Sequence, residues 1–243
     1  MQAWGLTDTG MVRSQNQDDY AIVKLSREQM LVLVCDGMGG AKSGNIASKM
    51  AVEVFTDEVK RTVRSGMKQE RIDRMLKDSV ELANKAVFEQ SQLSEEYQGM
   101  GTTLVAGFIQ KDRLTVVHVG DSRAYFLNEN GVNSITTDHS LVELMVQRGE
   151  LSRESAKNHP GKNLITRAVG TETDVECDIY HRELSKGDNL LLCSDGLSNI
   201  LSDQEILFEV VHGVKKDDCC QRLMKIANFR GSPDNVTIVL VSV

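Results

Sequence analysis

The chain opens with short runs of apolar residues separated by clusters of Gly, Asn and Asp. The first three runs are Ala3 to Thr7, Tyr20 to Leu25 and Met30 to Cys35. Runs of this length between turn-forming residues are typical of β-strands joined as hairpins. The pattern therefore predicts that the chain begins with an antiparallel sheet.

Two longer segments then place apolar residues at helical spacing. The first runs from Ile46 to Val59 and follows Ser43, a residue that suits the N-cap position of a helix. The second runs from Ile72 to Val87 in a strongly charged background. This second pattern predicts an amphipathic helix that packs on one side.

The rest of the chain returns to β-rich runs and ends with another pair of helical segments, from about Ser202 to His212 and from Asp217 to Phe229. Strands are predicted at Thr103 to Ile109, Leu114 to Val119, Ala124 to Leu127, Val132 to Thr136, Asn189 to Cys193 and Val236 to Val243. Residues 139–172 are mixed, and we expect an inserted flap there. Since strands cluster as hairpins and helices come in pairs, the pattern predicts an α+β fold in which helix pairs cover antiparallel sheets.

The composition is that of a globular protein, and nothing in it marks a boundary within residues 1–243, so we expect a single domain. No apolar run approaches the roughly 20 residues that cross a bilayer, and the start of the chain lacks the basic and apolar regions of a signal peptide. We therefore expect no membrane partner. The five cysteines follow no zinc spacing and are odd in number, which favours a reducing, cytoplasmic location.

The formal net charge of −7 argues against binding to nucleic acid, because proteins that bind a phosphate backbone usually present a basic face. The lysines and arginines are scattered instead. A surplus of acidic residues can include carboxylates that converge on divalent cations, so the positions of the aspartates matter more than their number.

Several aspartates stand at the ends of predicted strands. Asp36, Asp121 and Asp195 each follow an apolar run, and Asp18 and Asp234 flank strands from outside. Any one of them is most simply a turn residue. Carboxylates that gather at one sheet edge, however, repel one another and need a compensating cation.

Oxygen ligands without matching Cys or His spacing favour hard cations, so Mg²⁺ or Mn²⁺ fits this set better than Zn²⁺. Two such ions sharing a carboxylate can activate a water and neutralise phosphoryl oxygens. The aspartates therefore indicate hydrolysis of a phosphate ester.

Six blocks of residues resemble the bacterial members of the protein phosphatase 2C family, the metal-dependent protein phosphatases. They occur in the family's order across nearly the whole chain: Arg13 to Asp18, Val34 to Gly40, Gly101 to Thr103, Val119 to Arg123, Cys193 to Leu197, and Asp234 to Asn235. The resemblance implies a four-layer α-β-β-α sandwich of two antiparallel sheets flanked by helix pairs. It also implies hydrolysis of phosphoserine and phosphothreonine in proteins.

The resemblance implies a role for each matching residue at two core ions, either Mn²⁺ or Mg²⁺. Asp36 would bridge both ions. Asp195 and Asp234 would hold the first ion, and the carbonyl of Gly37 together with Asp18, through a water, would serve the second.

Three further roles follow from the same resemblance. Asp121 together with Asp195 would form a weaker third ion site. Arg13 would bind the substrate phosphate through its planar guanidinium group, and Asn235 would support the ligands from behind. The implied reaction is in-line attack of an activated water on the phosphomonoester, without a phosphoenzyme intermediate.

The general acid for the leaving alkoxide is left open by the sequence. Some relatives carry a histidine near the Asp-Gly-x-Gly-Gly block, but here Met38 and Ala41 occupy those places. A metal-held water and a residue of the 139–172 flap are the two candidates.

Two other functions were weighed. A nucleotide-binding P-loop at Gly37 to Ser43 is disfavoured, because Asp36 and Ala41 stand where that motif needs glycine. A phosphatase-like fold that has lost catalysis and serves as a regulatory or binding module is the stronger alternative. All five aspartates and Arg13 are present, which favours the enzyme.

The partners expected by analogy with bacterial relatives are phosphoproteins. They would be substrates of a partner Ser/Thr kinase, or instead a partner-switching regulator of sigma-factor type. A monomer is expected by default. His118 lies within an apolar run and is expected to be a satisfied core residue.

Overall fold

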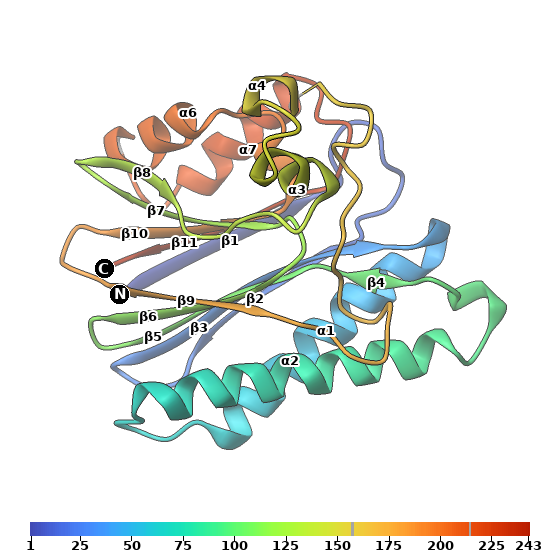
Figure 1. Cartoon of the computed structure of the whole chain (residues 1–243). Helices are drawn as coiled ribbons and strands as arrows, with labels where there is room; N and C mark the ends of the chain where they lie inside the picture. Colours follow the sequence, from blue (N-terminus) through green and yellow to red (C-terminus); the bar gives the residue numbers. More distant parts are fainter. Residues whose placement is uncertain (157, 214) are drawn as a thin grey trace.

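The computed structural model has four layers, in which two antiparallel sheets lie face to face and helices cover both outer sides (Figure 1). It describes residues 1–156, 158–213 and 215–243. The α+β prediction, including the four-layer α-β-β-α sandwich, is confirmed. Both chain ends lie at the same end of the sheets in Figure 1.

One sheet has five strands and the other has six. In order, the first contains β1 (Gln2–Asp8), β11 (Val236–Ser242), β10 (Asn189–Cys193), β7 (Arg123–Asn128) and β8 (Gly131–Ser134). The second contains β2 (Asp18–Lys24), β3 (Gln29–Met38), β5 (Leu104–Gln110), β6 (Arg113–Val119) and β9 (Asp178–Glu183), with β4 (Gly101–Thr102) paired to β3.

Helices cover each sheet on its outer face. The long helices α1 (Gly40–Thr62) and α2 (Gln69–Ser91) pack on the six-stranded sheet, followed by the 3₁₀-helix η1 (Glu95–Tyr97). The five-stranded sheet is covered by α5 (Asp195–Ser198), α6 (Asp203–Leu207), the π-helical turn η2 (Phe208–His212) and α7 (Cys219–Phe229). Two short helices, α3 (Leu141–Gln147) and α4 (Arg153–Ala156), lie in the expected flap.

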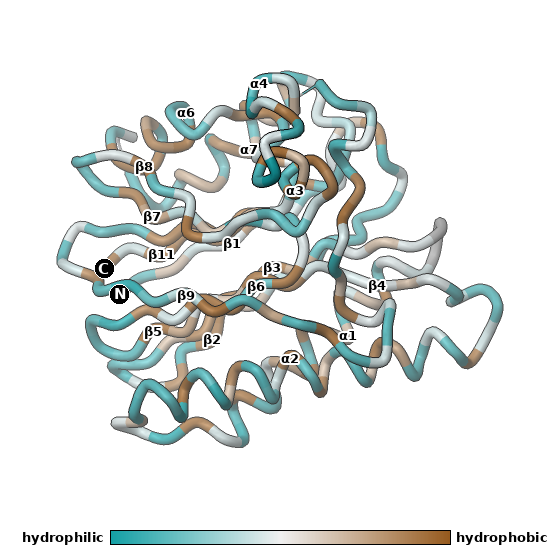
Figure 2. Tube along the Cα trace, viewed as in Figure 1, coloured by the Kyte–Doolittle hydropathy of each residue, from teal (hydrophilic) through white to brown (hydrophobic). Residues whose placement is uncertain are grey.

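Three apolar cores hold these layers together. One lies between α1, α2 and the six-stranded sheet, one between α7 and the five-stranded sheet, and one between the two sheets. Figure 2 shows hydrophobic residues concentrated along the strands and hydrophilic residues concentrated in the outer turns. The apolar stripe predicted for α2, from Ile72 to Val87, is buried.

Several elements differ from the sequence prediction, and for two of them the physical reason is plain. Helix α1 begins at Gly40 and not behind Ser43, because Gly39 turns the chain at φ 110°, a conformation that favours glycine. Strand β9 was not predicted at all. It is a polar edge strand, so it lacks the apolar run that marks the others.

No described helix is both long enough and apolar enough to span a bilayer.

The core between the sheets should dominate stability. Leu192 is fully buried in that core, so Leu192→Ala is expected to lower the free energy of unfolding by about 2–5 kcal/mol. Leu93→Ala is the matched control, because Leu93 is 72% exposed and should change the same quantity by less than about 0.5 kcal/mol. Urea denaturation measures both, and equal losses in the two variants would contradict the assignment.

Candidate metal centre

A cavity of about 480 Å³ is lined by the end of β3, by the first residue of α5 and by loops that adjoin both sheets. Six of the predicted site residues line it: Arg13, Asp36, Gly37, Asp121, Asp195 and Asp234. The other two, Asp18 and Asn235, are buried and do not line it. The fold therefore brings together residues that are up to 221 positions apart in sequence.

Strand pairing places the first two aspartates opposite each other. Asp36 in β3 is the register partner of Asp18 in β2. On the other side, the Asp36 N–H donates to Oγ1 of Thr103 (2.9 Å), and the Asp36 carbonyl accepts from the Thr103 N–H (2.9 Å) and the Thr102 hydroxyl (2.8 Å). The backbone that carries the central carboxylate is thus fixed from both neighbouring strands.

Asp18 joins the two sheets. Its Oδ2 accepts hydrogen bonds from the hydroxyls of Ser194 and Thr237, each at 2.7 Å, and both residues belong to the five-stranded side of the sandwich. Its Oδ1 is buried and has no hydrogen-bond partner among the described residues. A buried oxygen of this kind is an available acceptor.

Gly37 is required by a close approach of backbones. A Cβ at this position would lie 2.0 Å from the carbonyl oxygen of Gly44 in α1 and 2.5 Å from that of Gln17. β3 also continues through Gly37 and Met38, because β4 pairs with both. Asp36 therefore lies inside β3, whereas the sequence analysis predicted that it follows the end of the strand.

The remaining carboxylates come from turns that follow β6 and β10. Asp121 comes after Gly120, which adopts φ 108°. Asp195 is the first residue of the short helix α5, and its Oδ2 accepts from Nδ2 of Asn199 (3.0 Å). These turns aim both carboxylates into the same cavity.

Burial is the largest cause of raised carboxyl pKa values here. It raises the pKa of Asp18 and of Asp121 to about 7, and that of Asp195 to about 6. Burial, followed by the negative charge of Asp18, raises the pKa of Asp36 well above its usual range. These groups therefore resist being ionised together unless a cation joins them.

Arg13 is the single basic side chain among the described residues that line the cavity. It donates to Oδ2 of Asp234 at 2.7 Å, and the two side chains are 52% and 33% exposed. Asn235 anchors the loop that carries Arg13: its Oδ1 accepts from the Gln17 N–H (2.8 Å), and its Nδ2 donates to the carbonyls of Thr9 and Gln15 (both 2.9 Å).

The donor set fits a hard divalent cation. The acidic ligands are carboxylates, and no Cys or His is among the described residues that line the cavity. Within the described part of the chain, however, no three acidic, imidazole or thiol groups are arranged to hold an ion as they stand. Asp234 is paired with Arg13, so an ion held by this carboxylate would have to replace the guanidinium group.

Sequence reasoning missed a histidine behind Asp121. The Nδ1 of His139 accepts from the Gly120 N–H (3.0 Å), and the His139 N–H donates to the Gly120 carbonyl (2.8 Å). On the far side of its ring, Nε2 lies 3.2 Å from Asp178. A lone histidine in a loop carries no sequence signal for such a contact.

His118 is buried as expected but is not a satisfied core residue. Neither of its ring nitrogens has a hydrogen-bond partner among the described residues. Its ring lies 4.6 Å from that of His139, and burial lowers the pKa of His118 to about 3, so it is neutral.

Comparison with known proteins finds one family and several close relatives. The family model described as Protein phosphatase 2C matches residues 12–225. The serine/threonine phosphatase stp of Listeria welshimeri is 37% identical over 241 residues, covering 99% of this chain and 95% of the relative. The protein phosphatase PhpP of Streptococcus pneumoniae is 36% identical, covering 98% and 95%. The crystal structure of serine/threonine phosphatase Stp1 from Staphylococcus aureus superposes with a TM-score of 0.93 at 35% identity, covering 100% and 94%.

The raised carboxyl pKa values give a pH dependence to the metal-free protein. A carboxyl with a higher pKa in the folded chain binds more protons when folded, so stability falls as pH rises from about 4 to about 7. Asp36→Asn removes one of the repelling charges. It is expected to raise the melting temperature in EDTA at about pH 7.5 by about 2–4 °C for each kcal/mol gained.

The matched control is Asp112→Asn, which removes an exposed carboxylate outside the cavity. Its melting temperature in EDTA should follow that of the unaltered protein at each pH. An unchanged or lowered melting temperature for Asp36→Asn at neutral pH would show that the carboxylates do not strain the metal-free fold.

Proposed function

This chain belongs to the protein phosphatase 2C family and is a protein serine/threonine phosphatase, and from that premise we propose that its activity depends on two Mn²⁺ or Mg²⁺ ions. The observation that carries the proposal is the convergence of desolvated aspartates on a cavity whose described lining holds a single basic side chain. Such a set is stabilised by divalent cations.

The residues proposed to hold the ions are those of the cavity and its wall. Asp36 would be shared by both ions, with Asp195 and Asp234 on the first and the Gly37 carbonyl with Asp18 on the second. Asp121 would contribute to a weaker third site. When bound, the ions would supply an activated water and neutralise charge on the phosphoryl oxygens.

Arg13 would bind the phosphate of the substrate. Its guanidinium group stands at the mouth of the cavity, half exposed, and its present partner is Asp234. A metal ion that bound the Asp234 carboxylate would free the Arg13 guanidinium group. A planar guanidinium group can bind two oxygens of a phosphate at once, which an ammonium group does less well. Asn235 would position the loop that carries Arg13.

The flap would contribute to substrate contact and not to proton transfer. Asn163 and Ile165 are the flap residues among the described lining of the cavity, and neither side chain can give up a proton at neutral pH. Of the two candidates for the general acid, a water held by an ion is therefore favoured over a flap residue.

The proposed substrates are proteins phosphorylated on serine or threonine, so that the enzyme would oppose a Ser/Thr kinase. We propose that it acts as a monomer in the cytoplasm. The five free cysteines, four of them buried, fit a reducing compartment. The alternative of a regulatory module without catalysis is disfavoured because the carboxylates and Arg13 remain gathered at one cavity.

Metal dependence is tested with a small aryl phosphate and a phosphothreonine peptide. Turnover is expected with Mn²⁺ or Mg²⁺, and its loss in EDTA. Asp36→Asn and Asp195→Asn should each lower kcat/KM by about 10³-fold or more, because several kcal/mol of transition-state stabilisation depend on the ions. Asp112→Asn is the control. Folded protein that shows no turnover with any metal would favour the regulatory module.

Arg13 gives a second test of the same site. Arg13→Ala is expected to lower kcat/KM by about 10²-fold, and Arg13→Lys should recover part of the loss, since lysine keeps the charge but not the two-pronged geometry. Arg27→Ala, at an exposed position outside the cavity, is the control. If Arg13→Ala retained full kcat/KM, phosphate binding would have to be assigned elsewhere.

A further inference from the structure

One segment departs from the acidic character of the chain. Between residues 60 and 77 there are seven Lys or Arg and two Asp or Glu, in a protein whose formal net charge is −7. The sequence analysis described the lysines and arginines as scattered, but this segment concentrates them. The segment covers the end of α1, the connecting loop and the start of α2.

These residues surround a second cavity of about 660 Å³, which we call the hairpin pocket. It is lined by Glu58, Arg61, Thr62, Arg64, Met67, Glu70, Arg71, Arg74, Met75 and Asp78. The pocket lies at the C-terminal end of α1, whereas the metal cavity adjoins its N-terminal end. A helix of 23 residues is about 35 Å long, so the two cavities are well separated.

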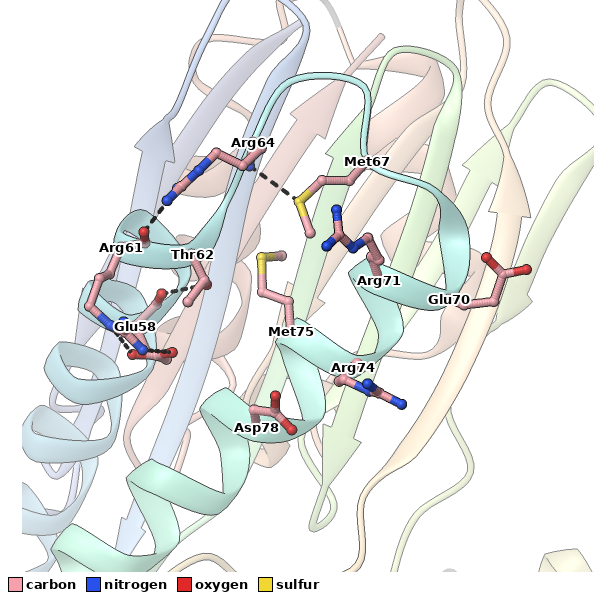
Figure 3. Close-up of a pocket in the computed structure, with 10 residues that line it drawn as sticks. All are labelled: Glu58, Arg61, Thr62, Arg64, Met67, Glu70, Arg71, Arg74, Met75 and Asp78. Carbon is pink, nitrogen blue, oxygen red and sulfur yellow. Dashed lines mark hydrogen bonds and ion pairs between the residues drawn. The ribbon is translucent and has the colours of Figure 1, made fainter.

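The floor of the hairpin pocket is apolar. Figure 3 shows Met67 and Met75 pointing toward each other between the two helices, with Arg71 beside them. Met75 is buried and Met67 is half-buried. Methionine side chains are flexible and polarisable, so they adapt to an inserted apolar group.

Two of the four arginines are committed to the fold. The Arg61 guanidinium donates to both carboxylate oxygens of Glu58 (2.8 and 2.6 Å). Arg64 donates to the carbonyls of Arg61 and Val63 (3.0 and 2.7 Å), which closes the end of α1. Glu58 is thereby neutralised as an acidic group of the pocket.

The side chains of the other two arginines are uncommitted. Arg71 and Arg74 are exposed, and neither guanidinium group has a hydrogen bond or ion pair with any described residue. The nearby acid Asp73 is not part of the lining, and its Oδ1 is engaged by Gln69 and His181 (both 2.9 Å). Glu70 and Asp78 do line the pocket, so that with Glu58 it holds three acids against four arginines. Two free planar cations beside an apolar floor favour a ligand with carboxylates next to an apolar side chain.

We propose that the hairpin pocket docks an acidic peptide segment of a partner protein, with an apolar side chain on the two methionines and carboxylates on Arg71 and Arg74. The volume suits a few side chains, and the formal charge of the lining, +1 from four arginines and three acids, is opposite to that of an acidic peptide. That the partners include phosphoprotein substrates rests on the proposed function. Docking so far from the metal cavity would raise the local concentration of substrate without changing the chemical step.

The binding test uses a labelled peptide of alternating glutamate and leucine without phosphate, followed by fluorescence anisotropy. R71E/R74E is expected to weaken binding by about tenfold or more, and added salt should weaken binding to the unaltered protein. Both positions are exposed on α2 and glutamate is a good helix former, so the variant should fold. K186E/K225E, with two exposed charge reversals outside the pocket, is the matched control and should bind normally.

A kinetic test separates docking from catalysis. With a phosphothreonine peptide that carries the acidic segment, R71E/R74E should raise KM by about tenfold and leave kcat unchanged, while turnover of an aryl phosphate stays the same in both variants. Binding without turnover would leave docking intact and overturn the proposed function. Equal peptide affinity in R71E/R74E and in the unaltered protein, or binding only to vesicles of anionic lipid, would overturn the docking proposal.

Discussion

The desolvation of carboxylates at the joint between two sheets is the constraint on which the rest of the structure depends. Asp36 and Asp18 face each other across adjacent strands, and Asp121 and Asp195 arrive from turns. Their raised pKa values express the cost of placing like charges together away from water. Hydrogen bonds that do not depend on an ion, such as the two between Thr103 and the backbone of Asp36, offset this cost. The metal-free fold thus gives up stability at the place where the ions are proposed to bind.

The ends of the helical layer differ in chemistry. Helix α1 begins directly after the turn at Gly39, next to the metal cavity, and ends at the arginines of the hairpin pocket. An acidic chain that must approach phosphorylated proteins gains from presenting positive charge at one defined place. In this account the phosphate ester is hydrolysed in the metal cavity, and the hairpin pocket contributes to the selection of partner proteins.

Much of the fold could be predicted from the sequence because burial follows the periodicity of apolar residues. The apolar stripe of α2 and the central strands could be predicted directly from this periodicity. The polar edge strand β9 could not, because half of its residues are exposed to solvent. The start of α1 depends on a positive φ at Gly39, which packs against residues distant in sequence.

The sequence predicted six of the residues that line the cavity, but not their contacts. Aspartates next to apolar runs can gather at one edge of a sheet, and this pattern pointed to Asp36, Asp121 and Asp195. The ion pair of Arg13 with Asp234 and the role of His139 behind Gly120 depend on loops brought together by folding. Likewise, the freedom of Arg71 and Arg74 is visible only once the partners of the neighbouring side chains are known.

The most direct test of the central claim is the anomalous scattering of crystals grown with Mn²⁺. The account predicts two ions at ligand distance from the Asp36 carboxylate, one of them also bound by Asp195 and by an Asp234 that has turned away from Arg13. Ions bound elsewhere, or an Asp234 still paired with Arg13 and no ion at Asp36, would contradict it.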